Sequence, residues 1–278
     1  MTSPAPSVDD KRHAFRRLHE HGCFVIPNPW DLGSALALQS LGFPALASTS
    51  SGFAWSQGHA DGAMPRERVL EHLHTLVAAT RIPVNADFES GYATTAAGVA
   101  ESVRLAIDTG IAGLSIEDAS GVAAEPLYPL NIAVERLQAA RQAIDRAGAD
   151  VLLVGRSEGF IRGRPDLAET TRRLRAYANA GADCLYAPGI RTREQIAAVV
   201  EAVAPKPVNV LIGGASEFTV SDLSGFGVRR ISVGGALARA AWTGFLEVAR
   251  RIATDGRFDG LGRAMPHAEL DALFGGES

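Results

Sequence analysis

The sequence Pro83-Val-Asn-Ala-Asp-Phe-Glu-Ser-Gly-Tyr92 joins an apolar segment to a pair of carboxylates. Residues 82–86 are predicted to form a short buried strand, because the apolar run follows a helical segment and a proline. Asp87 and Glu89 stand two residues apart, so an extended backbone would point both side chains the same way. Crowded carboxylates favour a hard cation between them, and oxygen ligands favour Mg²⁺. An acidic loop in water is the alternative that this stretch leaves open.

The same alternation of strand and helix extends outward from this stretch in both directions. Strands are predicted at 23–27, 45–48, 82–86, 113–116, 151–155, 183–186, 207–212 and 229–233. Helices are predicted at 9–21, 33–41, 65–79, 95–108, 131–147, 166–180, 191–202, 219–224 and 236–252. The strands are apolar throughout, which indicates burial on both faces of a parallel sheet. Eight such units predict an α/β fold of the (β/α)8 TIM barrel type; the competing open sheet lacks a G-x-G-x-x-G after its first strand.

The composition is that of an ordinary globular protein. The chain has 278 residues, of which 46% are hydrophobic and 21% charged, and we expect a single barrel domain over 1–278. A short helix would precede the barrel, and the last twenty-five residues are expected to be an irregular, polar tail. The net charge of −4 gives no basic surface for nucleic acid or a membrane, and no apolar run reaches the ~20 residues of a membrane span. Two cysteines are too few for a disulfide framework, so we expect a cytoplasmic protein.

Polar and charged residues follow the predicted strands at their carboxyl ends, where (β/α)8 barrels place catalytic groups. Because the middle of each strand is apolar, the set indicates a functional site rather than ordinary loop polarity. The segment 49–52 within it is expected to be a flexible polar loop. In chain order the residues at these ends are Asn28, Asp31, Ser48, Asp61, Asp87, Glu89, Glu117, Asp118, Arg156, Glu158 and Asn209.

These motifs resemble the isocitrate lyase/phosphoenolpyruvate mutase superfamily over nearly the whole chain. The resemblance rests on Pro27-Asn28-x-Trp30-Asp31, the segment 48–61, Asn85-Ala-Asp87-Phe-Glu89-Ser-Gly91-Tyr92, Ile116-Glu117-Asp118 and Gly155-Arg156-Ser-Glu158. It implies a Mg²⁺ site, with Mn²⁺ as an alternative metal. Asp87 would be the direct ligand, and the residues that hold the metal's water would be Glu89, Asp61 and Glu117. The family has aspartate at the position of Glu89; a register on Asn85 and Asp87 stays open, although it misplaces the family's glycine.

The resemblance also implies how a substrate would bind. A small 2-oxo or 2-hydroxy carboxylic acid would chelate the metal through its carboxylate and the adjacent oxygen. Arg156 would neutralise the developing enolate, which is electrostatic stabilisation by a preorganised cation. The residues expected to contact the substrate are Ser48, Thr49, Ser50, Trp30 and Asn209.

The loop after Glu117 departs from the lyases of this superfamily, which carry a Lys-Cys-Gly-His or Arg-Cys-Gly-His sequence there. Residues 121–128 read Gly-Val-Ala-Ala-Glu-Pro-Leu-Tyr, without cysteine or histidine. Glu125 lies eight residues past Glu117, where those lyases have their cysteine. It is either a loop-borne acid or a solvated residue. We expect the loop 119–130 to be a mobile lid over the barrel mouth.

The resemblance favours a lyase or decarboxylase that cleaves a C–C bond through a metal-stabilised enolate, in a mutase-like or oxaloacetate decarboxylase-like branch. One alternative is a P–C bond mutase or hydrolase acting on phosphonopyruvate, although the loop 119–130 has no Lys, Arg or His for a phosphonate. The other is a 2-oxo acid binding protein without lyase activity. The resemblance further implies a homodimer or homotetramer whose subunits exchange the helix 236–252.

Overall fold

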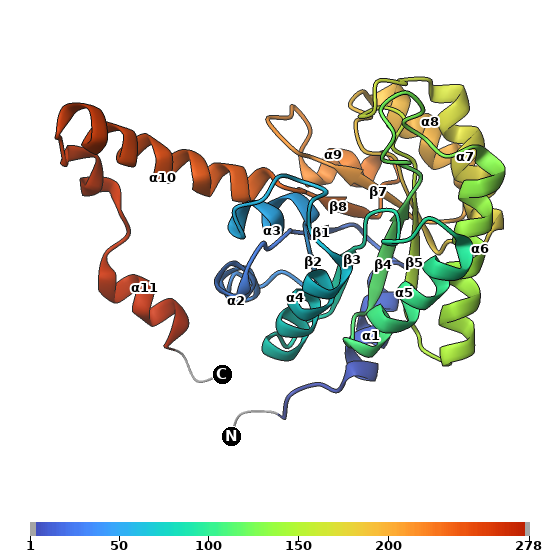
Figure 1. Ribbon diagram of the computed structural model, residues 1–278, viewed down its shortest axis with the longest axis horizontal. Coiled ribbons are helices and arrows are strands. Elements are labelled where there is room, and N and C mark those ends of the chain that lie inside the picture. Colours follow the sequence, from blue (N-terminus) through green and yellow to red (C-terminus); the bar gives the residue numbers. More distant parts are fainter. Residues whose placement is uncertain (1–3, 276–278) are drawn as a thin grey trace.

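Residues 4–275 are described by a computed structural model, in which eight parallel strands form a nearly closed barrel (Figure 1). From β2 to β8 each strand pairs with the next along the chain, and β8 pairs with β1. The Ala47 N–H donates to the Pro27 carbonyl (3.0 Å), which joins β2 to the chain just after β1. The prediction of a (β/α)8 barrel is therefore confirmed. The strands are β1 (Phe24–Ile26), β2 (Leu46–Ala47), β3 (Val84–Asp87), β4 (Gly113–Glu117), β5 (Leu152–Arg156), β6 (Cys184–Tyr186), β7 (Val208–Leu211) and β8 (Arg230–Ser232).

Helices alternate with the strands and cover the outside of the barrel (Figure 1). Apolar residues on their inner faces pack against the strands in one extended core, as the amphipathic patterns predict. Within residues 4–275 no helix is both long and apolar enough to cross a membrane. The helices are α1 (Val8–Leu18), α2 (Leu32–Ser40), α3 (Ser50–Ser56), α4 (Arg66–Ala79), α5 (Ala96–Asp108), α6 (Leu130–Ala147), α7 (Leu167–Asn179), α8 (Arg193–Val203), α9 (Val220–Gly225), α10 (Ala236–Asp255), the 3₁₀ turn η1 (Asp259–Arg263) and α11 (His267–Phe274).

The barrel interior is apolar at one end and polar at the other. Phe15 of α1 packs with Phe24, Ile26 and Leu152 and seals the end at which the strands begin. Farther along the strands, inward positions carry polar residues such as Asn85, where most such barrels have bulky aliphatic side chains. These polar positions leave a cavity that opens at the carboxyl ends of the strands.

The segment 49–52, predicted to be a flexible loop, instead begins the helix α3. Thr49 is the N-cap, and its Oγ1 accepts from the Gly52 N–H (3.3 Å). A Cβ on Gly52 would lie 2.9 Å from Trp30 Cβ and 3.3 Å from Ala238 Cβ, so only glycine lets the helix approach so closely. The polar residues serve as a helix cap here, because Ser and Thr satisfy the first backbone N–H groups of a helix.

The prediction of an irregular C-terminal end is wrong for 259–263 and 267–274, which form η1 and α11. Pro266 precedes α11, and the eight residues that follow favour a helix, with Glu269 in the first turn. α11 packs against α2, where Phe274 approaches Gly33. By contrast, α10 extends away from the barrel (Figure 1), and Ala238 is its one buried residue.

His72 of α4 makes the fold sensitive to acid. Its ring stacks on Phe53 (centroids 3.9 Å apart), and burial lowers its pKa from 6.5 to about 4. The unfolded chain therefore binds a proton more readily, so His72 stabilises the fold above pH 6.5, and this contribution is lost as the pH falls towards 4. By pH 5 the loss should reach about 2 kcal/mol. We expect His72→Phe to retain that much more of its pH 7 stability than the wild type in urea unfolding at pH 5; equal losses would contradict this.

Candidate active site

Asp87 at the end of β3 is held by hydrogen bonds from three directions. Its backbone N–H donates to Ser48 Oγ (2.9 Å), and its Oδ2 accepts from the Ser50 N–H (2.9 Å). Its Oδ1 accepts from Arg156 Nη1 (3.0 Å). Each carboxylate oxygen has two lone pairs, so both oxygens can take a further ligand. Asp87 is therefore fixed in place, while its carboxylate still borders the cavity.

Arg156 at the end of β5 lies among three carboxylates. Beyond Asp87, its Nη1 is 3.3 Å from Glu117 Oε2, and its Nε donates to Glu158 Oε1 (2.6 Å). Burial lowers the pKa of Arg156, but the three carboxylates outweigh burial and raise that pKa well above its usual value. Its Nη2 makes no hydrogen bond to residues 4–275, and the side chain lines the cavity. The guanidinium is thus permanently charged and has donors left for an anion.

Arg162 contacts two of these carboxylates, Glu158 and Glu117, from outside the cavity. Its Nε donates to Glu158 Oε2 (3.1 Å), and its Nη2 lies 3.5 Å from Glu117 Oε1. Burial raises the pKa of Glu117, with Glu158 and Asp87 adding to the effect and the two arginines opposing it. Three carboxylates and two guanidinium groups are thus packed together at this end of the barrel.

The turn after β3 holds Glu89 behind Asp87 in an uncommon backbone conformation. Glu89 and Tyr92 have φ of 45° and 51°, and Gly91 between them has 84°. Non-glycine residues rarely adopt positive φ, and such strain is concentrated at functional sites. Tyr92 donates its hydroxyl to Glu89 Oε1 (2.8 Å). The pKa of Glu89 is raised to about 7, mainly by burial, with the charges of Asp87 and Asp61 adding to the effect and the Tyr92 hydrogen bond opposing it.

Asp118 is the second carboxylate at the end of the fourth predicted strand, and its role is structural. Its Oδ2 accepts from the Tyr177 hydroxyl (2.6 Å) and from Arg173 Nη1 (3.1 Å), and its Oδ1 accepts from the Glu158 N–H (2.7 Å). It is 2% exposed and does not line the cavity. Asp118 therefore positions Glu158, which in turn holds Arg156.

The carboxyl ends of the strands enclose a cavity of about 180 Å³. Pockets for drug-sized ligands are about 300–1,000 Å³, so this cavity suits a small acid. It brings together many of the residues that the sequence predicted. Among the residues that line it are Asn28, Ser48, Thr49, Ser50, Asp61, Asn85, Asp87, Ser115, Arg156, Tyr186, Arg230 and Ser232.

The remaining predicted residues lie outside the cavity lining. Glu89 and Glu117 are just behind it, in contact with Tyr92 and Arg156 respectively. Trp30 is half-buried against Gly52. Asn209 is fully buried in the barrel and donates to Ser232 Oγ (2.9 Å), so it supports the cavity without bordering it.

Glu125 is exposed on the loop 119–130 and lines a separate cavity with Arg164 and Arg173. The base of the loop is joined by a β-bridge between Ala119 and Leu127, and its tip is exposed. As it stands, the loop does not bring Glu125 to Arg156.

Several cavity residues were not among the predicted site residues, among them Ser115, Tyr186, Ser232 and Arg230. The signal for Arg230 was its charge inside a strand that the pattern predicts to be buried on both faces. Asn28, noted only as a strand-end residue, accepts from the Val233 and Gly234 N–H groups (2.9 and 2.7 Å) and so joins the ends of β1 and β8.

The donor set suits a hydrated Mg²⁺ ion. Within residues 4–275, no three His, Cys, Asp or Glu side chains lie close enough to ligate one ion directly. Mg²⁺ does not require this, because it usually keeps several waters and binds through one or two carboxylates. Asp87 and Asp61 both line the cavity and offer only oxygen atoms, and a cation beside Asp87 would oppose the carboxylate repulsion that helps to raise the pKa of Glu117.

Comparisons with known proteins agree with this geometry. The family model for phosphoenolpyruvate phosphomutase matches residues 15–253. A crystal structure from Burkholderia cenocepacia J2315, whose assignment as a lyase/mutase is provisional, is 44% identical and covers 98% of both chains with a TM-score of 0.94. Oxaloacetate decarboxylase of Bradyrhizobium sp. (strain ORS 278) is 28% identical over 87% of this chain and 85% of its own.

A structure of oxaloacetate acetylhydrolase with its product oxalate is 26% identical, covers 97% of this chain and 94% of that chain, and has a TM-score of 0.84. Together with the family match, these likenesses confirm the resemblance that the motifs around Asp87, Glu117 and Arg156 indicated. The chain belongs to the phosphoenolpyruvate phosphomutase family, within the isocitrate lyase/phosphoenolpyruvate mutase superfamily.

Proposed function

We propose that this chain is a Mg²⁺-dependent enzyme that cleaves a C–C bond of a small 2-oxo or 2-hydroxy carboxylic acid through an enolate. The observation that supports it most strongly is the position of Arg156, fully charged beside Asp87 in a cavity sized for a small acid. Enzymes of this superfamily act on small carboxylic acids and use divalent metal ions. Lyase or decarboxylase chemistry is the form we favour.

Each residue of the site has a distinct part in this reaction. Asp87 would hold the ion directly, and Asp61, Glu89 and Glu117 would hold it through water. When bound, Mg²⁺ supplies Lewis-acid polarisation of the substrate carboxylate and its adjacent oxygen. The free Nη2 of Arg156 would donate to the oxygen on which the enolate charge develops. The hydroxyls at 48–51 line the cavity and would orient the carboxylate.

Turnover of a substrate panel with Mg²⁺ tests the proposal against its two rivals. We expect C–C cleavage of oxaloacetate, isocitrate or methylisocitrate, and none of phosphonopyruvate. Release of phosphate or formation of phosphoenolpyruvate from phosphonopyruvate would instead show P–C bond chemistry. Mg²⁺-dependent binding of 2-oxo acids without any turnover would show a binding protein.

The proton donor is proposed to be Glu125, carried to the cavity when the loop 119–130 closes. The bridged base and exposed tip of the loop suit a flap that excludes water from the enolate. Loss of a general acid costs about 10²–10⁴ in rate. Glu125→Gln should therefore lower kcat at least tenfold and leave oxalate bound nearly as tightly, by steady-state kinetics and calorimetry. A wild-type rate in Glu125→Gln together with a loss in Tyr186→Phe would transfer this role to the phenol of Tyr186, which lines the cavity.

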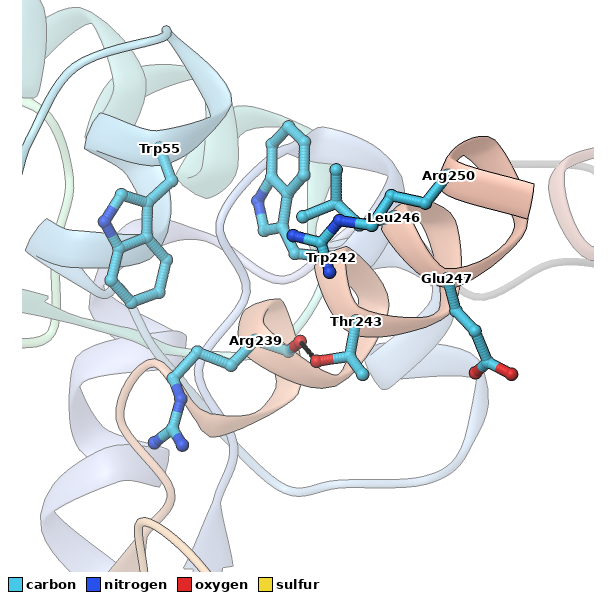
Figure 2. A pocket seen from close by; sticks show the side chains of 7 residues that line it. All are labelled: Trp55, Arg239, Trp242, Thr243, Leu246, Glu247 and Arg250. Carbon is cyan, nitrogen blue, oxygen red and sulfur yellow. Dashed lines mark hydrogen bonds between the residues drawn. The ribbon is translucent and has the colours of Figure 1, made fainter. Parts of the chain in front are cut away.

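We propose assembly into a homodimer or homotetramer because the helix α10 exposes apolar side chains. This helix exposes Leu237, Trp242 and Phe245, and it borders a cavity of about 750 Å³. Figure 2 shows Trp55 of α3 and Trp242 of α10 lining that cavity. Large exposed apolar patches mark contact surfaces, so a second copy would cover this face by exchanging α10.

A charge placed on this face should separate the subunits. We expect Phe245→Glu, at a side chain that is 60% exposed, to lower the mass measured by light scattering to that of one chain. Thr254→Glu at the far end of α10 is the matched control and should keep the wild-type mass. A wild type that is already monomeric at micromolar concentration would contradict the assignment.

A further inference from the structure

Arg136 on α6 is a buried guanidinium that holds three backbone carbonyls. It is 1% exposed, and in the part of the chain that the structure describes no carboxylate forms an ion pair with it. Its Nη1 donates to the Thr94 carbonyl (3.1 Å), and its Nη2 donates to the carbonyls of Ala93 (2.7 Å) and Ser90. All three carbonyls belong to the irregular turn 88–94 that follows β3. A planar fork of N–H donors suits such a set of neighbouring acceptors.

The turn 88–94 contains the strained backbone of the site. Glu89, Gly91 and Tyr92 all have positive φ, and such strain persists only where the surrounding contacts hold it. In the described chain no backbone N–H donates to the three carbonyls that Arg136 binds. Arg136 therefore supplies contacts that the backbone of the turn does not make for itself.

The conformation of this turn sets the place of Glu89, which would hold a water of the metal ion. The bond from Arg136 Nη2 to the Ser90 carbonyl fixes the chain immediately after Glu89. A return of Glu89 to negative φ would break this bond and move the Glu89 carboxylate relative to Asp87. Because Arg136 forms no ion pair in the described chain, it acts on Glu89 through the backbone and not through its charge.

Tyr128, at the end of the loop 119–130, lies over the Arg136 guanidinium. Arg136 Cζ is 4.3 Å from the centroid of the Tyr128 ring, which is a cation–π contact. The Tyr128 N–H donates to the Asp118 carbonyl (2.8 Å), and the Tyr128 carbonyl accepts from Arg173 Nη1 (2.9 Å). A backbone that is fixed at both groups thus holds the ring against the guanidinium.

We propose that Arg136 is a positioning residue for the metal side of the site. It holds the turn 88–94 so that Glu89 keeps its place behind Asp87, and Tyr128 keeps the guanidinium where it can do so. A helix on the outside of the barrel thereby contributes to the affinity for the metal. This inference rests on the proposed function, because that function gives Glu89 its part in holding a water of the ion.

Mn²⁺ binding to the full chain without substrate, measured by electron paramagnetic resonance, tests this apart from activity. Arg136→Lys keeps the charge but loses the planar fork, so we expect the affinity for Mn²⁺ to fall about tenfold. Arg12→Lys is the matched control, because Arg12 is also buried and donates to the carbonyls of Ile107 and Ile111 where the strands begin. Its affinity for Mn²⁺ should stay within threefold of the wild type, although both variants lower the melting temperature.

A double-mutant cycle shows whether Arg136 acts through Glu89. Glu89→Gln should weaken Mn²⁺ binding about 10- to 100-fold, the usual loss when a group behind a metal ligand is removed. Adding Arg136→Lys should then weaken it less than threefold more, because the carboxylate that Arg136 positions is already gone. A full second loss in the double variant would show that Arg136 acts on the fold as a whole, and would overturn the proposal.

Tyr128→Leu covers the case in which Arg136→Lys does not fold. It removes the ring over the guanidinium and leaves the three carbonyl bonds in place. We expect it to weaken Mn²⁺ binding at least threefold in the wild type and not in Glu89→Gln. A wild-type affinity in Tyr128→Leu would then overturn the proposal.

The failures are distinguishable. A wild-type affinity for Mn²⁺ in Arg136→Lys, together with a loss in Asp87→Ala, would overturn the assignment of Arg136 and leave the proposed function in place. Mn²⁺ bound as tightly by Asp87→Ala as by the wild type would overturn the proposed function instead. A wild type that binds no Mn²⁺ would contradict both.

Discussion

Asp87→Ala should abolish the Mg²⁺-dependent binding of oxalate, with at least a hundredfold loss of affinity in calorimetry. Asp87 is the only carboxylate assigned direct contact with the ion, and within residues 4–275 no cluster of three His, Cys, Asp or Glu side chains offers a second site. Its carboxylate also borders Arg156, so removal disturbs both charges that would hold the acid.

Two further variants separate loss of the ligand from loss of the fold. Asp87→Asn is nearly isosteric, can still accept from the Ser50 N–H, and should show the same loss of oxalate binding. Asp61→Ala, at an exposed position that would act only through water, should lose about tenfold or less. An unchanged affinity of Asp87→Asn for oxalate would contradict the assignment of Asp87 as the metal ligand.

Arg156→Lys should lower kcat by about 10²–10³, the usual loss when a donor to a developing oxyanion is removed. Lysine keeps the positive charge beside Asp87, Glu117 and Glu158, so the fold is spared the burial of three unpaired carboxylates. A lysine amine cannot both replace the hydrogen bond from Arg156 Nε to Glu158 and hold a donor in the place of Arg156 Nη2 towards the cavity. Steady-state kinetics with the best substrate of the panel measures the effect.

Arg162→Lys is the matched control for this variant. Arg162 contacts Glu117 and Glu158 as Arg156 does, but its side chain is 47% exposed and does not line the cavity. We expect its kcat to stay within about threefold of wild type, because screened, exposed ion pairs contribute little. Equal losses in the two variants would mean that Arg156 acts by holding the carboxylates together rather than by contacting substrate.

The sequence was sufficient to predict the barrel fold and the residues at the mouth of the site. Apolar strands that end in charge predict a parallel sheet, and parallel strands bring their carboxyl ends together, so Asp87 and Arg156 could be placed at the same mouth of the barrel without coordinates. Their contact at 3.0 Å is a finding of the structure. The family resemblance added the hypothesis that Asp87 ligates Mg²⁺, and Asp87 borders the cavity as that hypothesis requires.

The remainder depends on side-chain direction and loop conformation, which strand patterns do not contain. Asn209 was expected to contact substrate, but it points to Arg230 and Ser232 inside the barrel. Arg230 itself was passed over because it lies in the middle of its predicted strand and not at the end. Residues 49–52 and 267–274 were expected to lack regular structure because polarity and chain position were weighed above capping and helix propensity.

A crystal structure with Mg²⁺ and oxalate tests the central claim most directly. The account predicts Mg²⁺ on an Asp87 oxygen, oxalate chelating the ion, and Arg156 Nη2 donating to an oxalate oxygen within the cavity. Oxalate bound elsewhere, or bound in the cavity with the metal away from Asp87, would contradict it.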